Sequence, residues 1–139
     1  MEVRKVMGLL FRACCLVAAM SAVAAPEQQV TVDLAGLQRN AQAGDRMAQY
    51  NLGVLCETGR HGVPMDKAEA VRWYRKSAEQ GYENAQYNLG VLYLRGEGVE
   101  ENRETALHWL GLAAEQLNPA AISALETLGA QKKADPGGE

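Results

Sequence analysis

Apolar residues recur along the middle of this chain with the spacing of amphipathic helices. They stand at i, i+4 and i+7 in one stretch and at i, i+3, i+4, i+7 and i+8 in the next, and such spacings place side chains on one face of a helix. The residues concerned are Ala48, Leu52 and Leu55 in the first stretch, and Ala70, Trp73, Tyr74, Ser77 and Ala78 in the second. The pattern predicts two consecutive helices that form a pair.

The helix pair occurs twice in the chain. Residues 48–55 and 85–92 have the same sequence, AQYNLGVL, at an offset of 37. The second helix recurs at an offset of 36, where Ala70, Trp73, Ala78, Glu79 and Gln80 reappear as Ala106, Trp109, Ala114, Glu115 and Gln116. A period of about 20 to 50 residues is typical of a solenoid, in which each unit buries its apolar face against its neighbours. We therefore expect an all-α fold of two full helix-pair repeats flanked by half repeats.

The predicted helices begin and end at residues suited to those positions. Asp66 precedes Glu69 by three residues, and this spacing lets the two residues cap each other's backbone. Asn102 begins the equivalent later helix in the same way, and Asn118 followed by Pro119 predicts the start of a last helix. Positive φ angles are expected in the turns within each pair, at Gly59, Gly62, Gly96 and Gly98.

Two glycines lie inside predicted helices. Gly53 and Gly90 occupy the same position in the two copies, where glycine is less favourable than alanine by about 1 kcal/mol. A cost that recurs at the same position indicates a shared geometric need, and we expect another helix to approach closely there. Trp73 and Trp109 would fill the remaining space.

The first residues have the layout of a secretory signal peptide. Arg4, Lys5 and Arg12 flank an apolar stretch that ends in small residues at 22–24, which a signal peptidase accepts. The uncharged stretch is shorter than the roughly 20 residues that a membrane span needs. We expect cleavage after Ala24 and a periplasmic or secreted protein with no stable membrane insertion after cleavage; a retained membrane anchor is the alternative.

Cleavage would make the chain more acidic and leave a single thiol. Residues 1–24 hold one of the 17 acidic and three of the 14 basic residues, so 16 and 11 would remain, a formal net charge of −5. This charge disfavours nucleic acid and anionic lipid as partners. Cys56 alone cannot form an intramolecular disulfide. We expect a buried, inert thiol there, with an intermolecular disulfide or a reactive thiol as the alternatives.

The repeat and the leader together define the expected segments. They are 1–24 for the signal peptide, 25–43 for a lead-in and an N-terminal capping helix, 44–80 and 81–116 for the two repeats, 117–129 for a C-terminal capping helix, and 130–139 for a disordered tail. The tail is expected because its residues show no apolar pattern.

The motifs of both copies resemble the Sel1-like repeat family, a relative of the tetratricopeptide repeat. The matching segments are AQYNLGVLY at 85–93, GEGV at 96–99, ALHWL at 106–110 and AAEQ at 113–116, with AQYNLGVL at 48–55, AVRWY at 70–74 and AEQG at 78–81 in the first copy. The resemblance covers about residues 44–128 and implies a right-handed α–α superhelix that serves as a protein–protein interaction scaffold.

The chain departs from the family pattern at a few positions. Gly36 stands where the repeat predicts tryptophan and Leu117 where it predicts glycine, so the flanking half repeats are expected to be modified caps. Some exported members of the family carry paired cysteines and have been linked to penicillin binding. Here Cys56 aligns with Tyr93, which does not support that branch.

No group of residues in the sequence is suited to catalysis or to binding a metal or cofactor. An enzyme needs a nucleophile, an acid–base pair or a metal cluster in one pocket. His61 and His108 lie in different predicted elements, and neither has a Cys or His neighbour at ligand spacing. The glutamates between residues 97 and 104 are typical of a solvated helix start; a contact patch for a basic partner is the alternative. We expect no catalytic residue, no metal and no cofactor.

The resemblance implies that the first helix of each pair lines a concave surface, where another protein or peptide would bind. Residues shared by the copies can be explained by stacking alone, whereas residues that differ, such as Glu57 against Leu94, offer specificity. The candidate protein-binding residues are Met47, Tyr50, Asn51, Asn84, Tyr87, Asn88 and Arg95. Because Leu110 and Leu112 make the last paired helix more apolar, the end of the stack is an alternative binding surface.

These observations favour an exported, non-enzymatic interaction module or scaffold of the cell envelope, whose partner is another protein or peptide. An inhibitor or immunity-type protein of an exported enzyme is an alternative with the same physical basis. A hydrolase acting on cell-wall or β-lactam substrates is the least favoured alternative.

Overall fold

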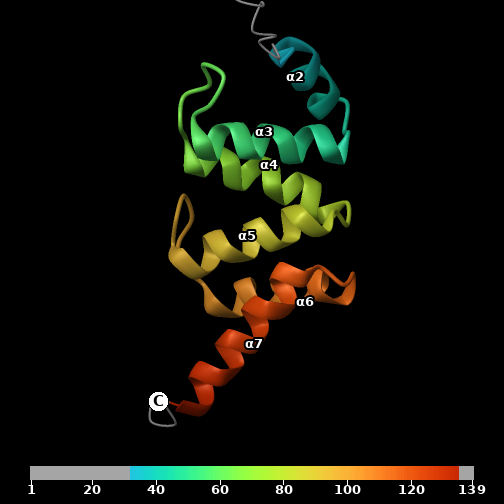
Figure 1. Ribbon diagram of the computed structural model, residues 1–139. Coiled ribbons are helices and arrows are strands. Elements are labelled where there is room, and N and C mark those ends of the chain that lie inside the picture. Colours follow the sequence, from blue (N-terminus) through green and yellow to red (C-terminus); the bar gives the residue numbers. More distant parts are fainter. Residues whose placement is uncertain (1–31, 135–139) are drawn as a thin grey trace, which may run out of the picture. The chain divides into compact units, whose positions relative to one another are not determined.

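The computed structural model describes residues 32–134, which form six α-helices (Figure 1). The helices are α2 (Leu34–Gln42), α3 (Arg46–Thr58), α4 (Lys67–Glu79), α5 (Glu83–Arg95), α6 (Arg103–Glu115) and α7 (Pro119–Ala134). Between residues 32 and 134 there is no β-strand. The expectation of an all-α solenoid is confirmed. The expected signal peptide lies outside the described residues.

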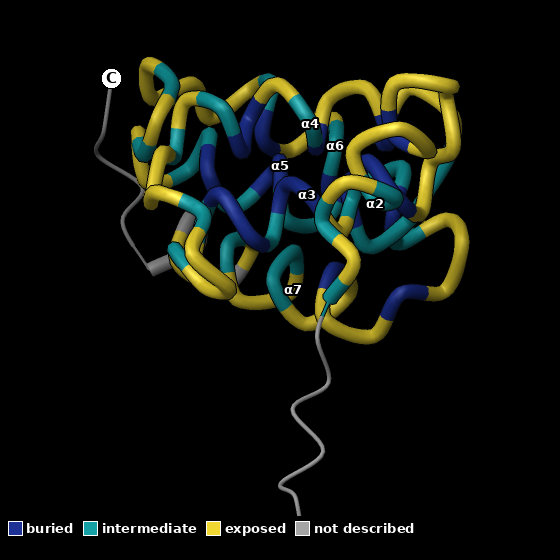
Figure 2. The backbone as a smooth tube through the Cα atoms, turned by 90° about the horizontal axis from the view of Figure 1, so that it is seen from above, coloured by how far each residue is buried: buried dark blue, intermediate teal, exposed yellow. Residues whose placement is uncertain are grey.

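The six helices stack in chain order, so that each packs against the next (Figure 1). Seen from above, α4 and α6 lie toward one side, and α3, α5 and α7 lie toward the other (Figure 2). We call α3 and α5 the A helices and α4 and α6 the B helices. The two pairs are α3 with α4 and α5 with α6, while α2 and α7 are the flanking half repeats.

The core consists of three clusters of buried side chains along the stack. The first joins α2 to α3, the second joins α3, α4 and α5, and the third joins α5, α6 and α7. The largest fully buried apolar side chains are Tyr74, Leu89, Leu92 and Leu110. Because each cluster joins only neighbouring helices, stability is expected to come from nearest-neighbour contacts, as in other repeat proteins.

The glycines inside α3 and α5 allow close helix approach, as expected. A Cβ atom on Gly53 would lie 2.6 Å from Cδ1 of Tyr74, and one on Gly90 would lie 2.8 Å from Cγ of Leu110. The side chains that face Gly53 and Gly90 are Tyr74 and Leu110, and not the tryptophans that were expected to fill the space there. Trp73 and Trp109 stand one residue earlier, which is a rotation of about 100° around the helix axis, and both are half-buried at the edge of the core.

Buried glutamines, at positions that both copies share, form hydrogen bonds between each repeat and the elements next to it. Gln49 donates to the Ala41 carbonyl (3.1 Å), and Gln86 donates to the Ala78 carbonyl (3.2 Å). Their carbonyl oxygens accept hydrogen bonds from Gln80 (2.7 Å) and Gln116 (2.8 Å), respectively. These residues satisfy one another's polar groups inside the stack, so their repetition has a structural cause.

The helix starts agree only in part with the sequence prediction. The predicted N-cap side chains accept backbone hydrogen bonds, Asp66 from Glu69, Asn102 from Thr105 and Asn118 from Ala121. The expected return bond from Glu69 to Asp66 is wrong. The Asp66 N–H donates instead to the Cys56 carbonyl (2.8 Å), and the Glu69 carboxylate accepts from Arg72 (3.1 Å).

The end of the described chain also differs from the expectation. Helix α7 continues to Ala134, so the expected disordered tail at 130–139 is wrong for residues 130–134. The added turn consists of alanine, glutamine and lysine, which favour helix. Before α7, Leu117 has φ 63°, close to the φ 80° of its counterpart Gly81. The turn therefore keeps its conformation although the glycine is replaced.

Candidate protein-interaction surface

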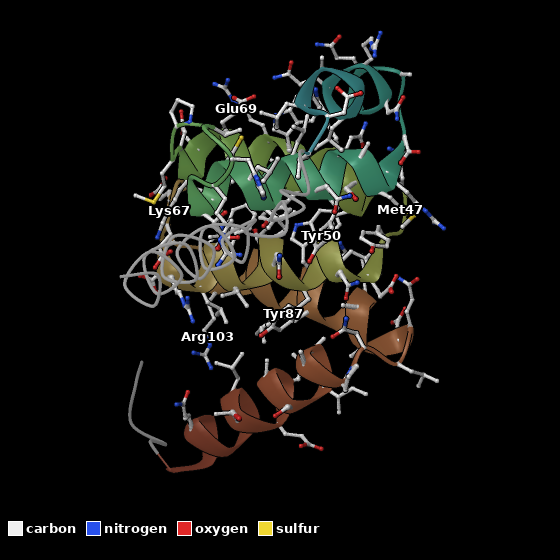
Figure 3. The ribbon with its side chains drawn as sticks, turned by 45° about the horizontal axis from the view of Figure 1, so that its top comes forward. Met47, Tyr50, Lys67, Glu69, Tyr87 and Arg103 are labelled. Carbon is white, nitrogen blue, oxygen red and sulfur yellow. The ribbon has the colours of Figure 1, made fainter. Side chains whose placement is uncertain are left out.

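The candidate contact residues lie on two A helices. They are Met47, Tyr50 and Asn51 on α3, and Asn84, Tyr87, Asn88 and Arg95 on α5. Figure 3 places Tyr50 between α3 and α5, and Tyr87 on the opposite edge of α5, toward α7. Met47 lies at the beginning of α3 (Figure 3). The structure therefore brings these residues to neighbouring helices but gives them different surroundings.

Tyr50 belongs to the contact between α3 and α5. Its ring lies 5.1 Å from the ring of Tyr82 in an edge-on arrangement and 5.8 Å from the ring of Tyr74. Burial raises the pKa of the Tyr50 hydroxyl, the neighbouring Tyr82 raises it further, and the Asn88 amide opposes the shift. The surroundings of Tyr50 are explained by packing between successive repeats.

Tyr87 and Asn84 belong to the contact between α5 and α7. Tyr87 packs against the core cluster that includes Leu110. The Asn84 amide donates to the Tyr82 hydroxyl (3.3 Å), and its carbonyl oxygen accepts from the Asn118 amide (3.0 Å). Both side chains are only partly accessible. Their contacts connect the second repeat to the C-terminal half repeat.

The exposed candidate residues are Met47, Asn51 and Arg95. The Met47 side chain is 57% exposed, and the other two are also exposed. Within residues 32–134, none of the three makes a side-chain hydrogen bond or an ion pair. These three residues are therefore available to a partner without loss of a contact that holds the stack.

A stripe of further residues continues this surface along the A helices. We define the A-helix face as the stripe Met47, Asn51, Val54 and Thr58 on α3, the stripe Asn84, Asn88, Val91 and Arg95 on α5, and Ala120, Ala124 and Thr127 on α7. Each member is exposed or half-buried. Thr58 was expected from the sequence as a position that differs from Arg95, whereas the two valines and the α7 residues were not expected. The spacing of Met47 and Asn51, extended along each helix, would have indicated them.

Some differences between the two copies are explained by packing and not by specificity. The hydroxyl of the fully buried Tyr74 donates to Oε2 of Glu57 at 2.6 Å. Burial, followed by this bond, raises the pKa of Tyr74. The second copy has Leu110 and Leu94 at the two equivalent positions, so both partners change together. The interpretation of Glu57 against Leu94 as a specificity difference is therefore wrong.

The same explanation applies to Arg75 and Lys76, which differ from Gly111 and Leu112. The Arg75 guanidinium donates to the Tyr93 hydroxyl at 2.5 Å, and Tyr93 stands where the first copy has Cys56. The Lys76 ammonium lies 4.2 Å from the centre of the Trp73 ring. Both cations thus contribute to contacts within the stack.

Residues with reactive or metal-binding side chains are dispersed. Cys56 is buried, and burial followed by the nearby Glu69 raises the pKa of its thiol. His61 lies in an exposed loop, and His108 packs edge-on to Trp109. No group of three or more His, Cys, Asp or Glu side chains in the described part of the chain is placed to hold a metal ion. None of the helices described is long and apolar enough to span a membrane.

The acidic segment that precedes α6 is partly neutralised within the stack. Glu97 forms an ion pair with Lys67 at the start of α4. The hydrogen bond from Lys67 lowers the pKa of Glu97. Glu100, Glu101 and Glu104 are exposed.

At the end of the stack, α7 covers α6. Leu110 is fully buried and Leu112 is half-buried. The end of the stack therefore offers less apolar surface than the sequence suggests, although Leu117 and Ile122 remain 79% and 37% exposed.

Comparison with known proteins agrees with the helical repeat. The sequence model of the Sel1 repeat matches residues 46–82 and 84–116, which together are just over half of the chain. A protective antigen of uropathogenic Escherichia coli strains, displaying an SLR fold, is 42% identical with a TM-score of 0.60, over 61% of this chain and 18% of that chain. A Sel1 repeat protein from Oxalobacter formigenes is 39% identical with a TM-score of 0.65, over 66% of this chain and 26% of that chain.

The chain thus spans less than a third of either solved structure. No curated protein matches it. The resemblance found in the sequence is confirmed by the family match and by both structures.

Proposed function

Because the chain belongs to the Sel1 repeat family, we propose that it is a non-enzymatic interaction module of the cell envelope that binds another protein or peptide on the A-helix face. Sel1 repeat proteins are typically protein–protein interaction modules. Beyond this general role, we propose the location in the cell envelope, binding on the A-helix face and the absence of catalysis.

The observation that carries the proposal is the separation of roles on the A helices. Tyr50, Tyr87 and Asn84 are held by contacts within the stack, whereas Met47 and Asn51 are exposed beside them. Binding to side chains on a rigid helical scaffold costs little conformational entropy on the side of the scaffold, because the helices are already ordered. The face is therefore suited to recognition by positioning.

The proposed location in the envelope is supported by the leader at residues 1–24. Expression of the full chain in a Gram-negative host, followed by fractionation and intact-mass measurement, tests it. We expect a periplasmic or secreted product that begins at Ala25. A full-length product retained in the cytoplasm would contradict this part of the proposal.

Partner capture tests the proposed face. The mature chain would be cross-linked to envelope extract, and the same chain carrying Met47→Glu and Asn51→Arg would be compared with it. We expect a saturable partner that the double variant loses. Arg72→Glu with Arg103→Glu is the matched control, because both arginines are exposed on B helices. Undiminished capture by the Met47→Glu and Asn51→Arg variant would exclude the A-helix face as the binding site, and equal loss in the control would show that the loss is not specific to that face.

A further inference from the structure

Two groups of three residues occupy equivalent positions at successive contacts of the stack, and they differ in polarity. The first group, which we call the polar trio, consists of Glu57 on α3, Tyr74 on α4 and Asn88 on α5. The second group, the apolar trio, follows at the offsets that relate the repeats and consists of Leu94 on α5, Leu110 on α6 and Ala124 on α7. Each trio therefore joins a helix pair to the helix that follows it (Figure 1).

The polar trio is held together by hydrogen bonds inside the stack. The hydroxyl of the fully buried Tyr74 donates to Oε2 of Glu57 at 2.6 Å. Burial raises the pKa of the Tyr74 hydroxyl, and a hydrogen bond with the Asn88 amide opposes this rise. The Asn88 amide acts in the same way on the neighbouring Tyr50. The buried Tyr74 hydroxyl thus depends on side chains from both α3 and α5.

The apolar trio is held together by packing alone. Leu94 and Ala124 pack against the core cluster that contains the fully buried Leu110. Leucine and alanine side chains have no hydrogen-bond donor or acceptor. A hydroxyl or amide placed among them from another part of the chain would therefore find no partner in the trio.

The residues that the two repeats share do not distinguish their helices. Residues 48–55 of α3 and 85–92 of α5 are identical, and this segment includes both the glycine that admits the B helix and the buried glutamine. The glutamine hydrogen bonds are also repeated at equivalent positions. Misassembly and domain swapping are characteristic failures of repeat proteins. Only contacts that differ between the repeats can prevent one helix from taking the place of its counterpart.

We propose that the two trios specify the order in which the helices assemble, and that they disfavour exchange of equivalent helices within the chain or between two copies of it. Packing of α4 against Gly90, in the place of α6, would set the Tyr74 hydroxyl against Leu94, which cannot accept its hydrogen bond. Packing of α7 in the place of α5 would set that hydroxyl against Ala124. A buried polar group without a partner costs its full desolvation penalty. The inference concerns assembly and does not depend on the proposed binding function.

A second contact between α4 and α5 differs between the repeats in the same sense. The Arg75 guanidinium donates to the Tyr93 hydroxyl at 2.5 Å. The equivalent residues of α6 and α7 are Gly111 and Gly129, and no other helix of the described chain comes within 4 Å of a Cβ placed on either. Helix α7 therefore offers no hydroxyl to Arg75, which again favours α5 as the neighbour of α4.

Refolding of variants with identical trios tests the inference. Glu57→Leu, Tyr74→Leu and Asn88→Ala together place the apolar trio at both contacts. The mature chain and this triple variant would be unfolded in urea and refolded at high protein concentration. We expect the variant to be helical but to give about tenfold more domain-swapped dimer than the wild type, because exchange no longer leaves a buried hydroxyl unpaired. Size-exclusion chromatography with light scattering measures the dimer, which should separate into monomers only after renewed unfolding.

The reverse triple variant carries Leu94→Glu, Leu110→Tyr and Ala124→Asn, places the polar trio at both contacts and should also give more dimer. The matched control combines all six substitutions, so that the trios trade places and still differ. It should give no more dimer than the wild type. Refolding of both triple variants to monomer, or as much dimer from the control as from them, would overturn the proposal. Loss of helicity in both triple variants by circular dichroism would also overturn it, because each trio should be able to support either contact.

Discussion

The two repeats have the same arrangement of helices, but different side chains pack against the glycine that they share. In the first repeat, Tyr74 packs against Gly53 and donates to Glu57. In the second, Leu110 packs against Gly90, and Leu94 takes the place of the glutamate. Side chains that contact each other have changed as a pair. A difference between copies therefore indicates partner binding only where the side chain has no partner inside the stack.

The largest effect is expected from adding a methyl group at the shared glycine. Gly53→Ala should destabilise the protein by about 2 kcal/mol, because the new Cβ would overlap the buried Tyr74 ring. Gly90→Ala should cost less, since Leu110 is more easily repacked than a ring. Urea unfolding of both variants measures the difference in the free energy of unfolding.

Gly111→Ala is the control for these variants, because nothing lies within 4 Å of the Cβ position and the residue is inside α6. It should stabilise by up to about 1 kcal/mol through helix propensity. Destabilisation at Gly111 equal to that at Gly53 would show that close packing is not the cause.

The effects of substituting Glu57 and Tyr74 on the free energy of unfolding are expected to be non-additive. Glu57→Leu alone should cost about 1–2 kcal/mol, because the buried Tyr74 hydroxyl loses its acceptor. Adding Tyr74→Phe should recover part of this loss, as both polar groups are then absent. A double-mutant cycle by thermal or urea unfolding measures the coupling. Strict additivity would mean that the hydrogen bond does not explain the paired change.

Smaller effects on stability, of opposite sign, are expected from exchanging leucine and glycine in the turn before α7 and in the equivalent turn before α5. Leu117→Gly should stabilise by about 0.5–1 kcal/mol, because leucine at φ 63° is strained. Gly81→Leu, the reverse change in the preceding turn, should destabilise by about 1 kcal/mol. Calorimetric melting temperatures of the two variants should move in opposite directions; a loss in both would indicate that the Leu117 side chain stabilises the fold.

The smallest expected effect is a decrease in the free energy of unfolding at alkaline pH, caused by Cys56 in the first repeat. The pKa of Cys56 is raised above 9.0 in the folded protein, so its contribution to stability is present below pH 9 and is lost as the pH rises through the folded value. Between pH 7 and pH 9 the loss should be about 0.5 kcal/mol or less. Cys56→Ala should flatten the dependence of the unfolding free energy on pH over this range, and an unchanged slope would assign the effect to other groups.

The repeat made much of the fold predictable from the sequence. Two aligned copies fixed the helix pairs, and the polar residues at Asp66, Asn102 and Asn118 marked helix starts correctly. The candidate site was less predictable. Tyr50 and Asn51 are adjacent and both are shared by the copies, yet one packs between helices and the other is exposed. Periodicity identifies the helix but not the direction from which its neighbours approach.

The sequence by itself determined the number of helix pairs, their order and the N-cap residues Asp66, Asn102 and Asn118, because these depend on local spacing and on repeated short motifs. Only the tertiary structure decided which residue opposes each shared glycine, which differences between the copies are internal pairs, and which polar side chains remain accessible on the A-helix face. Those properties depend on the rotation and separation of neighbouring helices. A shift of one residue turns a side chain by about 100°, which is enough to place Tyr74, and not Trp73, against Gly53.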